Sequence, residues 1–244
     1  MTSLQDLAPS DEMNLSNISN DELPELEALL ADLKRERDRD RLALYRPYTK
    51  QAEFHAAGKE HSDRLFMAGN QLGKTVAGGA EWAMHLTGRY PDWWRGKRFD
   101  EPVKMWAAGV TAESTRDNPQ RILVGPPPME RDWGTGMIPG DCIVDTTRAR
   151  GTPDLLDNIV VKHATGGESI LWFKSYIQGR EKWQGPTLHG CWFDEEPPLD
   201  IYSEGRTRTQ AMGIFTILTF TPLLGMSEVV MQFLTPEMVE RMAA

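Results

Sequence analysis

A glycine-containing loop that ends in lysine and threonine is the first feature of the sequence that could do chemistry. Between an apolar run and a helical stretch, the chain reads Gly69-Asn70-Gln71-Leu72-Gly73-Lys74-Thr75. Glycines let backbone N–H groups turn toward phosphate oxygens, and a helix N-terminus adds partial positive charge. In the P-loop pattern the lysine contacts the β- and γ-phosphates and the hydroxyl binds Mg²⁺. Lys74 and Thr75 are predicted to have these roles, although Ala68 replaces the first glycine of the pattern.

An acidic pair closes a second apolar run further along the chain, which reads Leu188-His189-Gly190-Cys191-Trp192-Phe193-Asp194-Glu195-Glu196. In the Walker B arrangement, an aspartate at a strand tip holds Mg²⁺ through its water shell and the next glutamate polarises the attacking water. We therefore predict Asp194 as the metal-binding carboxylate and Glu195 as the general base. The alternative is an exposed acidic turn after a core strand, and the upstream phosphate loop argues against it.

Two further groups could contact a nucleotide. Upstream, Tyr48 offers a ring that can stack on adenine, and the Gln51 amide can both donate to and accept from its edge. Downstream, Thr219 and Thr221 follow an apolar run, where hydroxyls can sense the γ-phosphate. The alternatives are a solvated glutamine on a loop and threonines that are ordinary strand formers.

The elements that must position these groups alternate between short apolar runs and helical stretches, which is typical of an α/β domain. Strands are expected at 64–68, 103–110, 187–193 and 214–221, a helix at 74–86, and a loop at 125–140. A hairpin is expected between 159–163 and 169–175, across Gly166-Gly167.

The chain divides into three parts by composition. Residues 1–20 are polar and are expected to form a disordered tail. Residues 21–44 are expected to form an N-terminal helix, and 45–244 the α/β domain. One face of the helix is an apolar stripe that either packs on its own domain or docks on a partner subunit; its members are Leu23, Leu26, Leu29, Leu30 and Leu33.

Composition and charge exclude several classes of protein. The net charge is −9, but residues 1–33 carry eight acidic residues and no Lys or Arg, so subtracting −8 leaves −1 for the rest. A local basic face for DNA therefore remains possible. No stretch approaches the roughly 18 apolar residues of a membrane span, and the N-terminus lacks a signal-peptide layout. Two cysteines are too few for a disulfide framework, which favours a reducing cytoplasm.

Taken together, these segments resemble the ATPase of the large terminase of tailed bacteriophages, over roughly residues 45–230. The most specific segments are Asp194-Glu195-Glu196-Pro197-Pro198 and Thr219-Phe220-Thr221-Pro222. The resemblance also includes Gly88–Trp94, in which we interpret the Trp93-Trp94 pair as packing. It implies a P-loop NTPase fold of the ASCE type for 45–244, with a central mostly parallel sheet, helices on both faces and an N-terminal helical extension.

The resemblance also implies cofactors, partners and a location. ATP and Mg²⁺ would bind at 69–75 with Tyr48 and Gln51, and Thr219 and Thr221 would couple hydrolysis to movement. The partners would be the portal protein, the small terminase subunit and double-stranded DNA, which a homo-oligomeric ring of about five subunits would drive into a procapsid. The location would be the host cytoplasm, transiently at the portal vertex, with no membrane.

Relatives of this kind stabilise the transition state with an arginine that a neighbouring subunit often supplies. Many have Arg-Gly before the acidic pair and a basic residue early in the loop, where this chain has Gln184-Gly185 and Asn70. Arg180 is our first candidate for this arginine, followed by Arg206 and Arg208.

Full-length terminases also carry a C-terminal nuclease. This chain stops at Ala244, soon after the coupling threonines, so nuclease activity is not expected of it. Two alternatives to a packaging motor remain open, namely a superfamily 1 or 2 helicase-like ATPase and a non-catalytic nucleotide-binding assembly module.

Overall fold

The computed structural model describes residues 23–69, 71–213, 215–222, 225 and 227–234. The chain forms two compact units, Met1–Asp38 and Arg39–Ala244. Helix α1 (Leu23–Arg39) is the described part of the first unit, and Leu23, Leu29, Leu30 and Leu33 on it are exposed. The tail expected at 1–20 lies outside the described residues, and both interpretations of the leucine stripe stay predictions.

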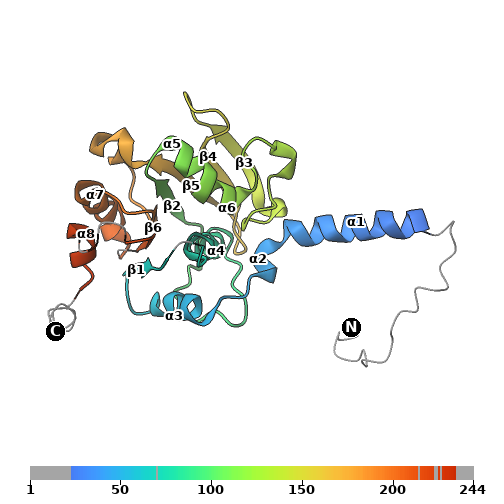
Figure 1. Ribbon diagram of the computed structural model, residues 1–244, viewed down its shortest axis with the longest axis horizontal. Helices are drawn as coiled ribbons and strands as arrows, with labels where there is room; N and C mark the ends of the chain where they lie inside the picture. Colours follow the sequence, from blue (N-terminus) through green and yellow to red (C-terminus); the bar gives the residue numbers. More distant parts are fainter. Residues whose placement is uncertain (1–22, 70, 214, 223–224, 226, 235–244) are drawn as a thin grey trace. The chain divides into compact units, whose positions relative to one another are not determined.

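The second unit is built on a mostly parallel sheet. Its described strands follow the order β1-β7-β6-β2-β5-β4-β3, in which all neighbours run parallel except β4, which is antiparallel to β5 and β3 (Figure 1). Strand β7 lies between the strand before the phosphate loop and the strand that ends in the acidic pair, which is the ASCE arrangement predicted. The strands are β1 (Asp63–Met67), β2 (Lys104–Gly109), β3 (Ile143–Arg148), β4 (Leu156–Lys162), β5 (Glu168–Ser175), β6 (Gly190–Asp194) and β7 (Thr216–Phe220).

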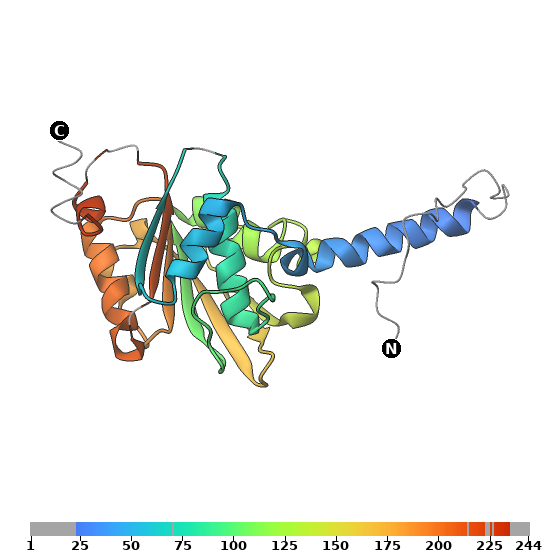
Figure 2. The same ribbon diagram turned by 90° about the horizontal axis from the view of Figure 1, so that it is seen from below.

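Helices cover both faces of this sheet, as predicted. In β6, Trp192 packs with residues of α4, whereas Cys191 and Phe193 pack with residues of α7 and α8, because successive side chains of a strand point to opposite faces. Figure 2 shows α4 and α7 on opposite sides of the strands. The helices are α2 (Arg41–Leu44), α3 (Thr49–Ala57), α4 (Lys74–Thr87), α5 (Ala112–Thr115), α6 (Arg121–Val124), α7 (Leu199–Thr209) and α8 (Glu228–Met231).

Several boundaries differ from those expected. The helix expected at 21–44 is interrupted at Asp40, whose carboxylate caps α2 by accepting from the Ala43 N–H (3.3 Å). Strand β6 begins at Gly190, three residues later than expected. Strand β3 and helices α3, α5, α6, α7 and α8 were not anticipated, whereas the β4–β5 hairpin was. Within the described residues, no helix combines the length and apolar character needed to cross a membrane.

A buried carboxylate joins the three elements around the phosphate loop. Glu81 of α4 is fully buried, forms an ion pair with Arg64 of β1, and contacts His55 Nδ1 of α3 at 2.7 Å. Burial alone would raise the pKa of Glu81, but Arg64 and the hydrogen bonds from His55 and His85 hold it well below its usual range. The ionised carboxylate therefore ties α3, β1 and α4 together.

Removing this charge should leave Arg64 buried without its counter-ion. We expect Glu81→Gln to lower the free energy of unfolding by about 3–5 kcal/mol, measured by denaturant titration. Glu53→Gln is the matched control, because Glu53 pairs with Lys50 at 2.7 Å on the exposed side of α3. The control should lose less than about 1 kcal/mol. Equal losses for the two variants would contradict the role given to Glu81.

Candidate nucleotide-binding site

The phosphate loop leaves the edge strand β1 and enters α4 at Lys74. Gly73, the residue before the helix, has φ +77°, a left-handed conformation that favours glycine. Lys74 is buried, and its Nζ donates to the Gly69 carbonyl at 2.7 Å. The ammonium therefore lies against the loop that is predicted to bind the phosphates. Gln71 also has positive φ, at 61°. Asn70 lies outside the described residues.

Gln51 holds the phosphate loop to helix α3. Its side-chain oxygen accepts from the Tyr48 N–H at 2.8 Å, and its nitrogen donates to the Gly73 carbonyl at 2.9 Å. A Cβ at position 73 would come within 2.7 Å of that nitrogen, which is a second reason for glycine there. Gln51 is thus buried on a helix, and the interpretation as a solvated loop residue was wrong. Its contact with adenine stays a prediction.

The strand ends bring Thr75, Asp194 and Thr219 together. Asp194 and Thr219 are register partners on the parallel strands β6 and β7, so their side chains meet at the carboxyl edge of the sheet. The Asp194 Oδ1 accepts from the Thr75 hydroxyl at 3.0 Å and from the Thr219 hydroxyl at 2.8 Å. Thr75 and Asp194, which are 119 positions apart in sequence, therefore lie within hydrogen-bond distance of each other.

Trp192 fixes the direction of the Thr219 hydroxyl. Its indole nitrogen, which can only donate, donates to Thr219 Oγ1 at 2.8 Å, so the single hydroxyl proton is free to point at Asp194. Thr219 is fully buried and bonds to Asp194, and its role in coupling stays a prediction. The ring reaches this position because Gly78 of α4 has no side chain; a Cβ there would lie 2.6 Å from the ring. Sequence reasoning missed Trp192, although its spacing of two from Asp194 places both on one face of β6.

Burial dominates the electrostatics of Asp194. It raises the pKa of this carboxyl from 3.8 to about 7, with Thr219 and Thr75 opposing the shift through hydrogen bonds and Glu195 adding to it. The two hydroxyls that contact this carboxylate carry no charge, so neither neutralises it when it is ionised. An ionised carboxylate beside a threonine hydroxyl suits a hard cation such as Mg²⁺, which binds through one or two carboxylates and keeps several waters. The residues present therefore fit a magnesium ion.

Glu195 begins the turn after β6 in a strained conformation. Its φ is +67°, in the left-handed region, which costs a residue with a side chain about 1–2 kcal/mol. The Glu195 N–H donates to the Thr219 carbonyl at 3.0 Å, so the strained residue is tied to β7. Backbone strain of this kind is often found at functional sites.

A cavity of about 840 Å³ adjoins the loop, between α3 and the edge strand β1. Tyr48, Gln51, Phe66 and Leu72 contribute to its walls, and Tyr48 and Leu72 are mostly exposed. The cavity is open and largely apolar, as expected for a purine base stacked on an aromatic ring. It therefore places Tyr48 and Gln51 beside the same space, next to the phosphate loop.

The three candidate arginines all have partners within the chain. Arg180 Nε contacts Glu204 of α7 at 3.0 Å, and Arg208 contacts the same carboxylate at 2.6 Å. Arg206 pairs with Asp63 at 2.7 Å. Within the described residues, the structure does not bring Arg180 together with Lys74, Thr75 and Asp194. Its role as a transition-state arginine stays a prediction.

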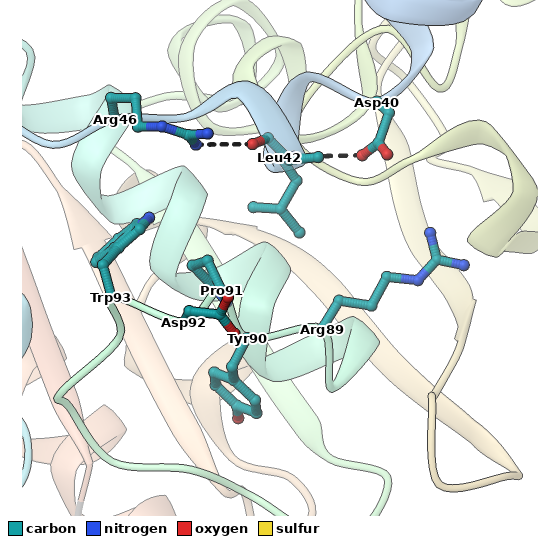
Figure 3. A pocket seen from close by; sticks show the side chains of 9 residues that line it. Asp40, Leu42, Arg46, Arg89, Tyr90, Pro91, Asp92 and Trp93 are labelled. Atoms are coloured by element: carbon teal, nitrogen blue, oxygen red, sulfur yellow. Dashed lines mark hydrogen bonds between the residues drawn. The ribbon is translucent and has the colours of Figure 1, made fainter. Parts of the chain in front are cut away.

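A second cavity, of about 490 Å³, lies between α2 and the segment after α4 (Figure 3). The two arginines in its wall already have partners within the chain. Arg46 donates to the Ala43 carbonyl at 2.8 Å, and Arg89 forms an ion pair with Asp141. The second cavity lies at the C-terminal end of α4, and the phosphate loop lies at the N-terminal end of the same helix. The two sites are therefore separate. Of the neighbouring tryptophans, Trp94 is 2% exposed and packs on His55, which agrees with a packing role.

The family model described as "Terminase large subunit, T4likevirus-type, N-terminal" matches residues 65–243, which include the loop, the acidic strand and β7. The chain belongs to this family. It is 48% identical over 237 residues to the terminase large subunit of Salmonella phage P22, covering 90% of this chain and 48% of that protein. It is 28% identical over 239 residues to the terminase large subunit of Enterobacteria phage LP7, covering 90% and 49%.

The chain spans about half the length of the curated relatives it matches. Among solved structures, it is similar to the large terminase from the thermophilic bacteriophage D6E in complex with ADP. The identity is 13%, the TM-score is 0.41, and the match covers 86% of this chain and 48% of that one.

The raised pKa of Asp194 predicts a pH-dependent stability. The unfolded carboxyl ionises near 3.8 and the folded one near 7, so the folded chain loses stability as the pH rises through this window. The full penalty, at most about 4 kcal/mol, is present above pH 7. Without divalent metal, we expect Asp194→Asn to unfold at higher denaturant concentration than the wild type at pH 8, with the difference vanishing near pH 4.

Mg²⁺ supplies the control for this measurement, because it should stabilise the wild type at pH 8 and leave Asp194→Asn almost unchanged. A stability difference between the two proteins that does not vary with pH would contradict the account of Asp194.

Proposed function

We propose that the chain is an ATPase motor that hydrolyses ATP to translocate double-stranded viral DNA into a procapsid through the portal. The observation that carries this proposal is the contact between Thr75 of the phosphate loop and Asp194 of β6. It joins the two halves of a phosphate and metal site in a chain of the terminase family.

Each residue has a distinct task in the proposed reaction. Lys74 and the backbone of the loop bind the β- and γ-phosphates, and Tyr48 and Gln51 bind adenine. Thr75 and Asp194 would hold Mg²⁺, which would neutralise charge on the phosphates. Glu195 accepts the proton of the attacking water, and Thr219 links Asp194 to β7, along which the loss of phosphate can be passed on.

The wider assembly is proposed from family membership alone. The partners are the portal protein, the small terminase subunit and double-stranded DNA, and the working form is a homo-oligomeric ring of about five subunits. The ring acts in the host cytoplasm, at the portal vertex of the procapsid. The residues after position 33 have a net charge near zero, so DNA would be gripped by local groups or with help from partners.

Substitution of Glu195, which directly follows β6, should affect ATP hydrolysis without affecting ATP binding. We expect Glu195→Gln to bind ATP with wild-type affinity and to lose about 100-fold or more in turnover, because an amide keeps the shape but cannot take the proton. Glu196→Gln is the matched control and should stay within about threefold of wild type. Nucleotide affinity and steady-state ATPase rate are measured on all three proteins. Full turnover by Glu195→Gln would favour a different base. Absence of ATP turnover by the wild type, even with portal and DNA, would favour a non-catalytic module, and strand displacement without capsids would favour a helicase.

The isolated chain should be a slow ATPase if its arginine comes from a neighbour. An arginine supplied in trans is worth about 10³–10⁵ in rate, so specific activity should rise with protein concentration or on addition of portal and DNA. Arg180→Ala should remove this rise and spare ATP affinity, and mixing it with Glu195→Gln protein should restore some activity.

The control for Arg180 is Arg148→Ala, which also removes a surface ion pair, with Glu130 at 2.9 Å. It should behave as the wild type. A fast ATPase in a strictly monomeric sample, independent of concentration, contradicts the in-trans arginine.

A further inference from the structure

The backbone at Glu195 has to be held in place by something outside the turn. Among the described residues other than glycine, positive φ occurs at Gln71, Asp154 and Glu195. Aspartate tolerates this region because its short side chain can bond locally, whereas glutamate has no such advantage. The conformation therefore persists only because neighbouring groups fix it.

Both peptide groups that flank Glu195 are fixed by hydrogen bonds. The Glu195 N–H donates to the Thr219 carbonyl at 3.0 Å. The Tyr176 hydroxyl lies between the carbonyls of Asp194 and Glu195, at 2.9 and 2.8 Å, and its single proton is shared between them. With the preceding peptide held on both sides and the following one held by Tyr176, neither φ nor ψ of Glu195 is free to change. The direction of its Cα–Cβ bond is then set as well.

Tyr176 is itself firmly placed. It follows β5 directly, in a 3₁₀ turn (Tyr176–Gln178), and is 5% exposed. Its ring lies near those of Trp183 and Phe193, with centroids 6.1 and 6.2 Å away. Burial, with the charges of Asp194 and Glu195, raises the pKa of the phenol well above its usual range, so the hydroxyl keeps its proton and remains a donor.

We propose that Tyr176 is a positioning residue for catalysis: its hydroxyl holds the backbone of Glu195 in the left-handed conformation that aims the carboxylate at the attacking water. This inference rests on the proposed function, since it assigns Tyr176 a part in the same hydrolysis. Tyr176 acts through Glu195 and does not touch the nucleotide. The residues proposed to bind phosphate lie in the loop after β1 and at the start of α4, so we expect loss of the hydroxyl to leave ATP binding intact.

The test uses Tyr176→Phe in the intact chain, because it removes the hydroxyl and keeps the ring. We expect kcat for ATP hydrolysis to fall about 10-fold or more, since a small misplacement of a catalytic group can cost up to about 100-fold. KM and Kd for ATP should stay within about twofold of wild type. The matched control is Tyr202→Phe, which removes a hydroxyl from the same core cluster away from the turn and should keep kcat within about twofold.

Two further measurements separate positioning from packing. Tyr176→p-aminophenylalanine keeps an N–H donor at the same place and should restore most of kcat. In a Glu195→Gln background, Tyr176→Phe should have almost no further effect on residual turnover, because residues that act as a unit are not additive.

The outcomes distinguish the two proposals. If the wild type hydrolyses ATP and Tyr176→Phe has the same kcat, the positioning role is wrong and the proposed function stands. It is also wrong if Tyr176→Phe and Tyr202→Phe lose kcat equally, or if the p-aminophenylalanine protein stays as slow as Tyr176→Phe. If the wild type hydrolyses no ATP under conditions that include portal and DNA, the proposed function fails and the inference fails with it.

Discussion

The Asp194 carboxylate, buried at the carboxyl end of β6, is the group on which the rest of the site depends. It lies where burial makes its charge costly, and the groups that contact it are the hydroxyls of Thr75 and Thr219. A threonine from the helix after the loop and a threonine from the adjacent strand thus converge on one oxygen. Any change in the spacing between α4 and β7 must alter these hydrogen bonds.

Polar bonds connect the elements of the scaffold behind this carboxylate. Gln51 connects α3 to the loop, Glu81 connects α4 to β1 and α3, and Trp192 connects β6 to β7. The bonds of Glu81 and Trp192 are buried, that of Gln51 is partly buried, and each joins different elements of the fold. Because a buried polar group that loses its partner costs free energy, the arrangement specifies one geometry rather than several.

The sequence predicted those parts whose signal is local. Gly73, Lys74 and Thr75 occur together before a helix, and Asp194 follows a buried strand, so motif and context could be recognised at once. The α/β character and the β4–β5 hairpin were likewise predictable from apolar runs and from paired glycines, whereas the mostly parallel sheet was expected from the family resemblance. What could not be predicted depends on pairing between distant segments. Gln51 contacts Gly73 only because α3 packs against the loop. The contact between Tyr176 and Glu195 likewise has no sequence pattern that predicts it.

The left-handed backbone at Glu195 makes folding and activity compete for the same position. Glycine or asparagine there would relieve the strain, but neither carries a carboxylate. Glycine at this position would therefore raise the free energy of unfolding and remove the carboxylate in the same step. The hydrogen bonds from the Tyr176 hydroxyl and to the Thr219 carbonyl offset part of this strain in the folded chain.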